Sequence, residues 1–150
     1  MAQGCIPRHD GSMTEFRLIV VLALLLAAPA RAGDTLSAHL GEVTAADRFT
    51  TAAGEEVRLA GVFTLGYSAP AEAALTRLLR GRVLTLQPAD PPRDRYGILR
   101  AYVRLPGGEG VNGLMLRRGH LYASPYLEDA QQRQAFFDLE VAAAKTRRGL

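Results

Sequence analysis

Arginines are the residues of this sequence best suited to chemistry with phosphate groups. Lys145 is the only lysine, so all other basic side chains are arginines, whose planar guanidinium can bind a phosphate with two hydrogen bonds at once. This composition suits a nucleic-acid ligand, although a GC-rich genome produces the same preference for arginine without any function.

Other catalytic chemistry has less support in the sequence. The single cysteine, Cys5, lies in a segment that we expect to be removed, so the remaining chain offers no disulfide, thiolate nucleophile or cysteine metal site. His39 and His120 have no carboxylate at metal-ligand spacing and are interpreted as surface or satisfied histidines. Asp47, taken by itself, suits a residue that caps a hairpin turn.

The charged candidates also fit purely structural roles. Arg58 could form an ion pair with Glu55 or Glu56 across the predicted turn. Asp94 and Arg95 could form a solvated pair within their own turn. The residue types alone leave these alternatives open.

The N-terminal part predicts an export signal. Residues 18–30 form an apolar run of 13 residues, which is too short to cross a bilayer comfortably. Arg17 precedes this run and Ala30-Arg31-Ala32 follows it as a small-x-small cleavage site, the order typical of a secretory signal peptide over residues 1–32. Met13 would be a more conventional start, and cleavage would leave residues 33–150 in the periplasm or secreted.

Length and composition indicate one globular domain. The 150 residues carry a net charge of +3, too small for a histone-like polycation, and 48% are hydrophobic, which excludes a disordered tail. No internal repeat or long linker follows residue 33. A domain of this length buries about two-thirds of the surface of its unfolded chain, which is enough to form a core without disulfides.

The element order predicts an α+β fold that is mainly β. Patterning and turn residues predict five strands: Thr35–Val43, Phe49–Thr51, Val57–Val62, Val83–Leu86 and Ile98–Leu105. Helical periodicity predicts three helices: 69–80, Val111–Arg118 and Glu128–Arg148. Runs of strands with interposed helices favour a largely antiparallel sheet over a parallel βαβ arrangement.

Local signals set the expected ends of these elements. Gly54 suits the hairpin turn, Ser68 suits the N-cap of the first helix, and Pro88 is expected to end the fourth strand. The breaker-rich segment Asp90–Gly97 predicts a loop. The expected buried face of the last helix consists of residues at i, i+4 and i+7: Phe137, Val141 and Ala144.

Four sequence segments, in this order, resemble the staphylococcal nuclease (thermonuclease) family. They are Arg58-Leu59-Ala60-Gly61-Val62, Asp94-Arg95-Tyr96-Gly97, Val111-Asn112 with Leu116-Arg117-Arg118-Gly119, and Arg148-Gly149-Leu150. The similarity spans roughly residues 38–150. It implies a five-stranded OB-type barrel with about three helices, which agrees with the predicted elements, and such barrels bind oligonucleotides on one face.

The resemblance implies a partly retained site for calcium and phosphate. Asp47 stands where the family has a calcium-binding aspartate, and Arg58 matches the arginine that grips the scissile phosphate. Thr64 matches a threonine that offers its carbonyl oxygen to calcium. Arg95 and Tyr96 match residues that contact a neighbouring phosphate.

Three further side chains of the family's site are replaced. Phe63 stands in place of a second calcium-binding aspartate, Gly66 in place of the general-base glutamate, and Ile98 in place of a second phosphate-binding arginine. The remaining aspartate and carbonyl make a weak site, because calcium takes about six to eight oxygen ligands. Losing a positioned base lowers a rate about 10²–10⁴-fold. The nearest substitutes are Arg100, on the same strand face as Ile98, and Glu72 in the first predicted helix.

We therefore expect a secreted, monomeric, thermonuclease-like domain that is catalytically impaired and retains binding of nucleic acid or another polyanion. No cofactor is expected, whereas an active form would require calcium. Tyr122 and Tyr126, near the family's base-contacting tyrosines, are interpreted as core or rim aromatics. Two alternatives stay open: an active calcium-dependent nuclease with a rearranged site, and an envelope scaffold for an unknown protein partner.

Overall fold

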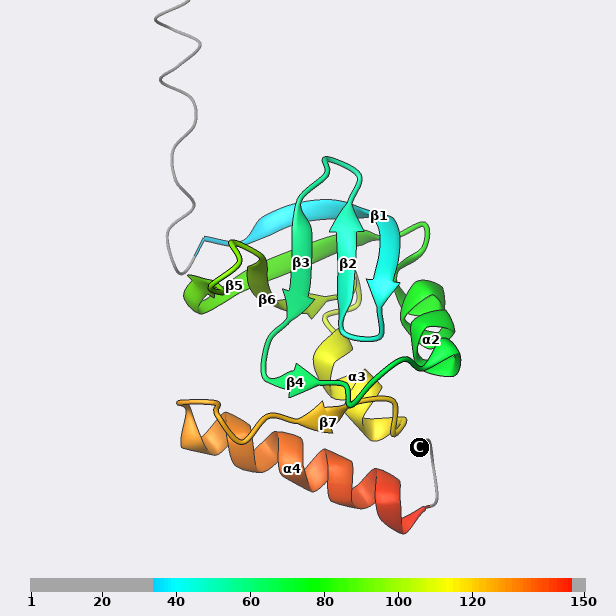
Figure 1. Ribbon diagram of the computed structural model, residues 1–150, viewed down its shortest axis with the longest axis vertical. Helices are drawn as coiled ribbons and strands as arrows, with labels where there is room; N and C mark the ends of the chain where they lie inside the picture. The colour runs from blue at the N-terminus through cyan, green and yellow to red at the C-terminus, as the bar shows by residue number, and fades with distance from the viewer. Residues whose placement is uncertain (1–33, 147–150) are drawn as a thin grey trace, which may run out of the picture. The chain divides into compact units, whose positions relative to one another are not determined.

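Ten elements of secondary structure follow one another in the part of the chain that the structure describes. The computed structural model describes residues 34–146, so the predicted leader, its cleavage site and residues 147–150 lie outside that range. In chain order (Figure 1) the elements are β1 (Leu36–Ala45), β2 (Arg48–Thr51), β3 (Glu56–Leu59), β4 (Val62–Phe63), α2 (Ala69–Leu79), β5 (Val83–Arg93), β6 (Leu99–Arg104), α3 (Val111–Arg117), β7 (Tyr122–Ala123) and α4 (Ala130–Lys145).

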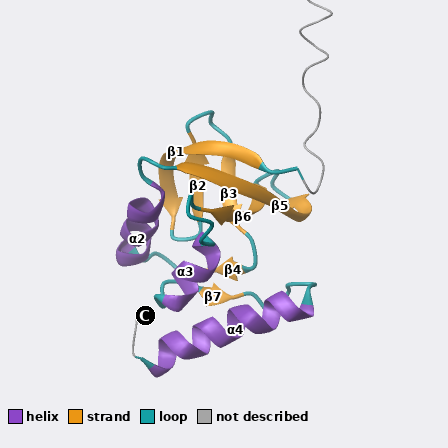
Figure 2. Cartoon of the chain, turned by 180° about the vertical axis from the view of Figure 1, so that it is seen from behind, coloured by secondary structure: helices purple, strands orange, loops and turns teal. Residues whose placement is uncertain are grey.

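Five of these strands close into a barrel in the order β1-β2-β3-β6-β5. Within residues 34–146 the barrel strands pair antiparallel, apart from β3 and β6, which run parallel. β4 and β7 form a separate two-stranded sheet near α3 and α4 (Figure 2). The structure confirms the predicted fold, which is mainly β with a five-stranded OB-type barrel and three helices in the described range.

Strand alternation explains how the barrel forms around a core. In β2, β3 and β6 the inward positions are buried and apolar: Phe49, Val57, Leu59, Leu99, Ala101 and Val103. Successive side chains of a strand point to opposite faces, so the residues between them point outward. Those outward positions include Arg48, Arg58 and Arg100. The periodicity that builds the core therefore also places these arginines on the outer surface of the barrel.

α2 begins where the sequence predicts and buries the predicted face. The Ser68 hydroxyl accepts a hydrogen bond from the Ala71 backbone N–H at 3.4 Å, and Pro70 lies in the first turn. The buried face consists of Ala71, Ala74, Leu75, Leu78 and Leu79. Each fully buried leucine stabilises the fold by about 1.5–3 kcal/mol, which fixes the helix beside β1.

The third predicted strand divides into β3 and β4. Gly61, between them, has φ +72°, and a Cβ at this position would lie 2.6 Å from Leu127 Cδ1. Glycine is therefore needed both for the left-handed turn and for the close approach of Leu127. The turn directs Val62 and Phe63 away from the barrel, where they pair with β7.

β5 is longer than predicted, because Pro88 does not end it. Regular pairing with β6 continues to Pro88 opposite Ala101, then shifts and resumes with Arg93 opposite Leu99. Proline donates no backbone hydrogen bond and is tolerated where a ladder is irregular, as it is here. The predicted loop over Asp90–Gly97 is accordingly shorter and starts at Asp94.

α4 has a different start and a different buried face from those predicted. It begins at Ala130 because the Asp129 carboxylate accepts hydrogen bonds from the backbone N–H groups of the next turn. Val141 is 50% exposed and Ala144 is exposed, so this part of the predicted stripe is wrong. The residues that pack inward are Phe136, Phe137, Leu139 and Ala143.

Within residues 34–146 no helix is long and apolar enough to cross a membrane.

Asn112, at the start of α3, ties the helix to β6 and the end of β3. Its side chain is buried, and its Oδ1 accepts a hydrogen bond from the Val103 N–H at 3.0 Å. Its Nδ2 donates to the carbonyls of Ala60 at 2.8 Å and Ala101 at 3.3 Å. These bonds bridge the two parallel strands at and just beyond their last pair, Leu59 with Ala101, and so hold their register.

Candidate functional site

Three arginines form a row across the outer face of three neighbouring strands. Arg48 of β2 lies opposite Arg58 of β3, and Arg58 lies opposite Arg100 of β6. Neighbouring strands are about 4.8 Å apart, so these like charges lie close together. Like charges directly opposite destabilise a sheet, so this arginine row requires anions beside it.

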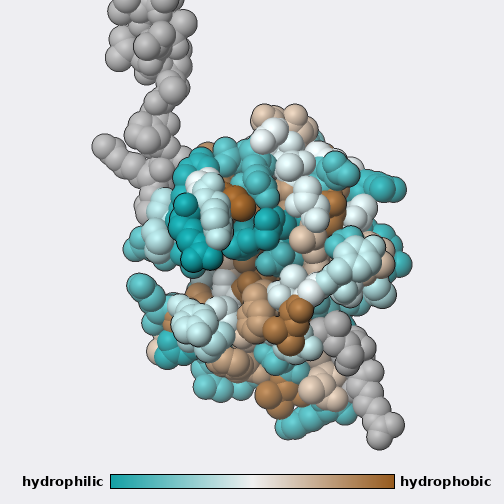
Figure 3. Space-filling model, viewed as in Figure 1, coloured by the Kyte–Doolittle hydropathy of each residue, from teal (hydrophilic) through white to brown (hydrophobic). Residues whose placement is uncertain are grey.

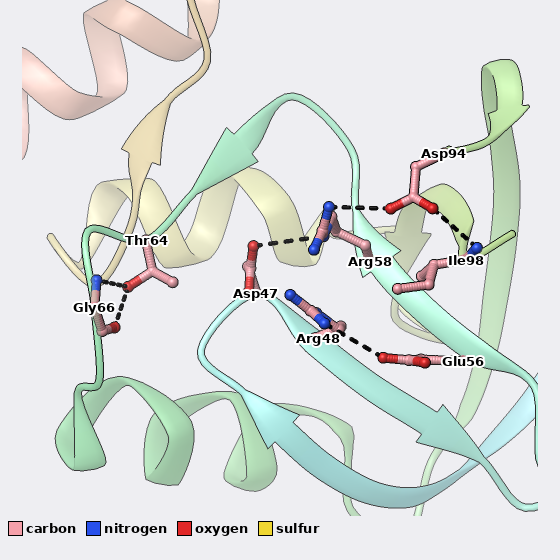
Figure 4. Close-up of polar contacts among 8 residues, drawn as sticks. All are labelled: Asp47, Arg48, Glu56, Arg58, Thr64, Gly66, Asp94 and Ile98. Carbon is pink, nitrogen blue, oxygen red and sulfur yellow. Dashed lines mark hydrogen bonds and ion pairs between the residues drawn. The ribbon is translucent and has the colours of Figure 1, made fainter. Parts of the chain in front are cut away.

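Carboxylates from three places supply part of that charge (Figure 4). Arg58 Nη1 donates to Asp94 Oδ2 at 3.0 Å, and Arg58 Nε lies 3.9 Å from Asp47 Oδ2. Arg48 pairs with Glu56 at 3.5 Å. The ion pair of Arg58 with Glu55 or Glu56 that the sequence left open is therefore not the one formed.

The register of the hairpin explains this correction. Glu56 lies opposite Thr50, so it is diagonal to Arg48 and reaches that side chain rather than Arg58. Glu55 instead pairs with Arg93 of β5, at 2.7 Å. Arg58 is left to the carboxylates of the two flanking turns.

Asp94 both holds Arg58 and closes the loop before β6. Its Oδ1 accepts hydrogen bonds from the backbone N–H groups of Tyr96 at 2.9 Å and Ile98 at 3.0 Å. Burial alone would raise the pKa of the Asp94 carboxyl. The two backbone hydrogen bonds and the charges of Arg58 and Arg48 outweigh burial and hold the pKa below its ordinary value.

This lowered pKa predicts how stability depends on acid. The contribution of Asp94 is complete above the ordinary aspartate pKa of about 3.9 and declines as the pH falls through the lower folded-state pKa. Asp94→Asn keeps an oxygen for the backbone N–H groups but loses the charge, and we expect it to reduce the unfolding free energy by about 1–2 kcal/mol at pH 7. Urea unfolding at a series of pH values should show this difference shrinking below about pH 4.

The control for this measurement is Asp90→Asn. Asp90 is exposed and has no ion pair within residues 34–146, so its replacement should change stability little at any pH. A loss in Asp94→Asn that stays the same size at about pH 2 would contradict the ion-pair role.

An open cavity of about 540 Å³ adjoins the arginine row. Its lining combines the β2–β3 side with the segment from β4 to α2: Asp47, Arg48, Arg58, Phe63, Thr64, Gly66, Tyr67 and Glu72, among others. Asp47 is only 6% exposed, and its Oδ1 and the Nε atoms of Arg48 and Arg58 are buried without hydrogen-bond partners. Buried polar atoms are normally bonded, so this wall has unused hydrogen-bonding capacity beside open space.

The residues of this cavity do not fit a calcium ion. The retained aspartate, Asp47, faces the positive charge of Arg58, which opposes a bound cation. The Thr64 hydroxyl donates to the Gly66 carbonyl at 2.7 Å, so the predicted pair offers a cation only the Asp47 carboxylate and the Thr64 carbonyl oxygen. Within residues 34–146 no group of three or more His, Cys, Asp or Glu side chains is arranged to hold a metal ion, whereas calcium takes about six to eight oxygens.

The loop between β5 and β6 places Arg95 and Tyr96 at the surface. The Arg95 guanidinium lies 4.7 Å from the centroid of the Tyr96 ring, a cation–π contact, while Asp94 is engaged by Arg58 instead. Arg100 Nη1 donates to the Pro91 carbonyl at 3.2 Å. The buried Ile98 side chain extends toward Arg58 (Figure 4), so an arginine there would adjoin the row.

The predicted aromatic and histidine candidates have separate surroundings. Tyr122 packs against Phe63 with 5.7 Å between ring centroids, and Tyr126 is 89% exposed. His39 is exposed, and His120 is half-buried. Burial and the nearby charges of Arg118 and Arg77 lower the pKa of His120. The two tyrosines and the two histidines lie outside the lining of the 540 Å³ cavity, although Phe63 belongs to it.

Arg48 is the member of the arginine row that sequence reasoning missed. The hairpin itself carried a signal. Residues at equal distances before and after the centre of its turn, Ala53, lie opposite each other, and this symmetry sets Arg48 opposite Arg58. Glu72, considered as a substitute carboxylate, does line the same cavity as Asp47 and Arg58.

The space-filling view shows that the barrel side of this face is mostly hydrophilic, with apolar residues gathered toward β4 and β7 (Figure 3).

Comparison with known proteins adds no assignment to this geometry. No family model matches the sequence, and no curated protein matches it.

Proposed function

We propose that this chain is a thermonuclease-like domain that binds a phosphate-bearing polyanion, with single-stranded nucleic acid as the first candidate, and does not hydrolyse it. The observation that carries the proposal is the arginine row of Arg48, Arg58 and Arg100 beside an open cavity. The predicted leader would place this binding in the periplasm or outside the cell.

The arginine row suits phosphates for reasons of geometry. Each guanidinium has five N–H donors in a planar fork, so an arginine engaged by one carboxylate keeps donors for a phosphate. Successive arginines are about 4.8 Å apart across the strands, which allows one flexible chain of phosphates to contact several of them. Tyr96, exposed at the adjoining loop, offers a ring on which a base can stack.

The same geometry limits affinity. Asp47, Glu56 and Asp94 already lie beside the row, so an incoming phosphate competes with them for the arginines. The affinity should therefore be modest at physiological salt and higher at low salt, because phosphate contacts release counterions.

Fluorescence anisotropy with a labelled oligothymidylate tests this proposal. If three arginines neutralise three phosphates, a plot of log affinity against log salt should have a slope of about −2, since each single-strand contact contributes about −0.7. Arg58→Ala should lower affinity for oligothymidylate and oligodeoxyadenylate alike and reduce the slope by about 0.7. Asp94→Asn should raise affinity, because it removes the competing charge.

Arg82→Ala is the matched control, because it removes an equal charge at an exposed position before β5. It should change affinity much less than Arg58→Ala does. Equal losses in the two variants would show that only overall charge matters and would contradict a site at the row. Absence of any binding at low salt would reject the polyanion proposal and leave the scaffold alternative.

A further inference from the structure

A second cavity, of about 410 Å³, lies where the barrel meets α3 and α4. Figure 2 shows α3 between the barrel and α4, so this cavity is walled by three layers of the fold. Six of its lining side chains carry the argument: Gln87, Tyr102, Arg104, Arg117, Gln132 and Phe136. It shares no lining residue with the cavity beside the arginine row, and its volume is within the range of about 300–1,000 Å³ typical of small-molecule sites.

The charged residues of this second cavity leave an excess of one positive charge. Arg104 comes from the outer face of β6 and Arg117 from the last turn of α3. Neither has a carboxylate within 4.0 Å in the described part of the chain, where the ion pairs belong to other arginines. Glu109 is the acidic residue in the lining, so the two guanidinium groups and this carboxylate sum to +1.

The uncharged part of the lining combines an aromatic wall with free amides. Tyr102 and Phe136 meet edge to face, with 6.5 Å between centroids. Burial, aided by Asp129 and opposed by Arg100, raises the pKa of Tyr102, so its phenol is neutral at physiological pH. The side-chain amides of Gln87 and Gln132 make no hydrogen bond within residues 34–146, although both line the cavity.

Other features of this lining are explained by the fold itself. Asn112 has its hydrogen bonds satisfied by backbone groups, and a Cβ at Gly113 would lie 3.3 Å from Leu139 Cδ1, so these two residues serve the packing of α3. The guanidinium groups of Arg104 and Arg117 and the side-chain amides of Gln87 and Gln132 make no such bond within residues 34–146, so they are available to a ligand beside the aromatic wall.

We infer that this cavity is a binding site for a small monoanionic compound with a flat ring, such as an aromatic carboxylate. Arg104 and Arg117 would hold the acid group, because charge-assisted hydrogen bonds to guanidinium are strong and directional. Tyr102 and Phe136 would contact the ring, and the glutamine amides would bond to its polar substituents. This site is independent of the arginine row and of polyanion binding.

Three probes test whether binding requires the ring and the negative charge together. Benzoate carries both ring and charge, acetate carries the charge alone, and benzyl alcohol carries the ring alone. We expect saturable binding of benzoate in NMR titrations of the ¹⁵N-labelled protein, with shifts at Tyr102 and Phe136, and at least about tenfold weaker binding of the other two. An oligothymidylate should not displace benzoate.

Two arginine variants and one control complete the test. Arg104→Gln and Arg117→Gln should each weaken benzoate binding about tenfold or more. Arg118→Gln should leave it unchanged, because Arg118 ends the same helix but does not line the cavity, which controls for charge at the helix terminus. All three are exposed, so folding should be retained. Equal effects in all three variants, or no saturable benzoate binding, would overturn the inference.

Discussion

Heat-denatured DNA will remain intact during incubation with the purified protein and calcium, and a chelator will not change that result. The reason lies in the donor set of the 540 Å³ cavity. Asp47 faces Arg58, Phe63 stands where a second carboxylate is expected, and the position expected to hold a general base is Gly66. The absence of a positioned base would by itself slow hydrolysis about 10²–10⁴-fold. Gel analysis of the DNA over time measures the outcome.

Restoring the three replaced side chains should create the activity that the unmodified protein lacks, which provides a positive test of this prediction. Gly66→Glu has room for its side chain, since a Cβ there meets nothing within 4 Å, but φ +159° is a conformation that residues with a Cβ rarely adopt, so this loop must shift to accept glutamate. Phe63 already lines the cavity and Ile98 extends toward Arg58. Phe63→Asp, Gly66→Glu and Ile98→Arg together should produce calcium-dependent cleavage, whereas each single change should do little, because residues that act as a unit are not additive.

Robust cleavage by the unmodified protein would contradict this view. Asp47→Ala and Glu72→Gln would then identify the rearranged site, because both carboxylates line the cavity. Glu42→Gln, an exposed carboxylate of β1 that lies outside this lining, is the matched control and should retain full activity.

The barrel could be predicted from the sequence because its signals are local and agree with one another. Inward positions of β2, β3 and β6 alternate with charged or polar residues, and Ser68 with Pro70 marks the start of α2. Each signal needs only a few neighbouring residues to be read. The outward direction of Arg58 follows from the same alternation, so its availability to a ligand was predictable too.

The partners of Arg58 could not be predicted in the same way. Asp94 lies 36 residues further along the chain and reaches Arg58 only because β6 pairs parallel to β3. The continuation of β5 past Pro88 likewise depends on an irregular ladder with β6, and the inward face of α4 depends on contacts such as Phe136 with Tyr102. All three are set by pairing between distant segments, which local patterns do not contain.

Asn112→Ala is expected to lower the free energy of unfolding by about 4 kcal/mol. Its amide makes three buried hydrogen bonds, to the Val103 N–H and to the carbonyls of Ala60 and Ala101. Truncation leaves the Val103 N–H and the Ala60 carbonyl without these partners, at about 1–3 kcal/mol each and less than additively, while the Ala101 carbonyl keeps its bond from the Ala60 N–H. Because typical domains are stable by only about 5–15 kcal/mol, this is a large fraction of the total. Urea denaturation followed by circular dichroism measures it.

Asn112→Ala should also affect the candidate site, because Asn112 bridges the strands that carry Arg58 and Arg100 at the end of their pairing. We therefore expect faster amide hydrogen exchange in β3 and β6, and weaker oligothymidylate binding, under conditions where Asn112→Ala is still folded. Gln131→Ala removes an equivalent amide from an exposed position of α4 and should change neither stability nor exchange. If the two truncations have equal effects on stability, Asn112 does not hold the register of the arginine-bearing strands.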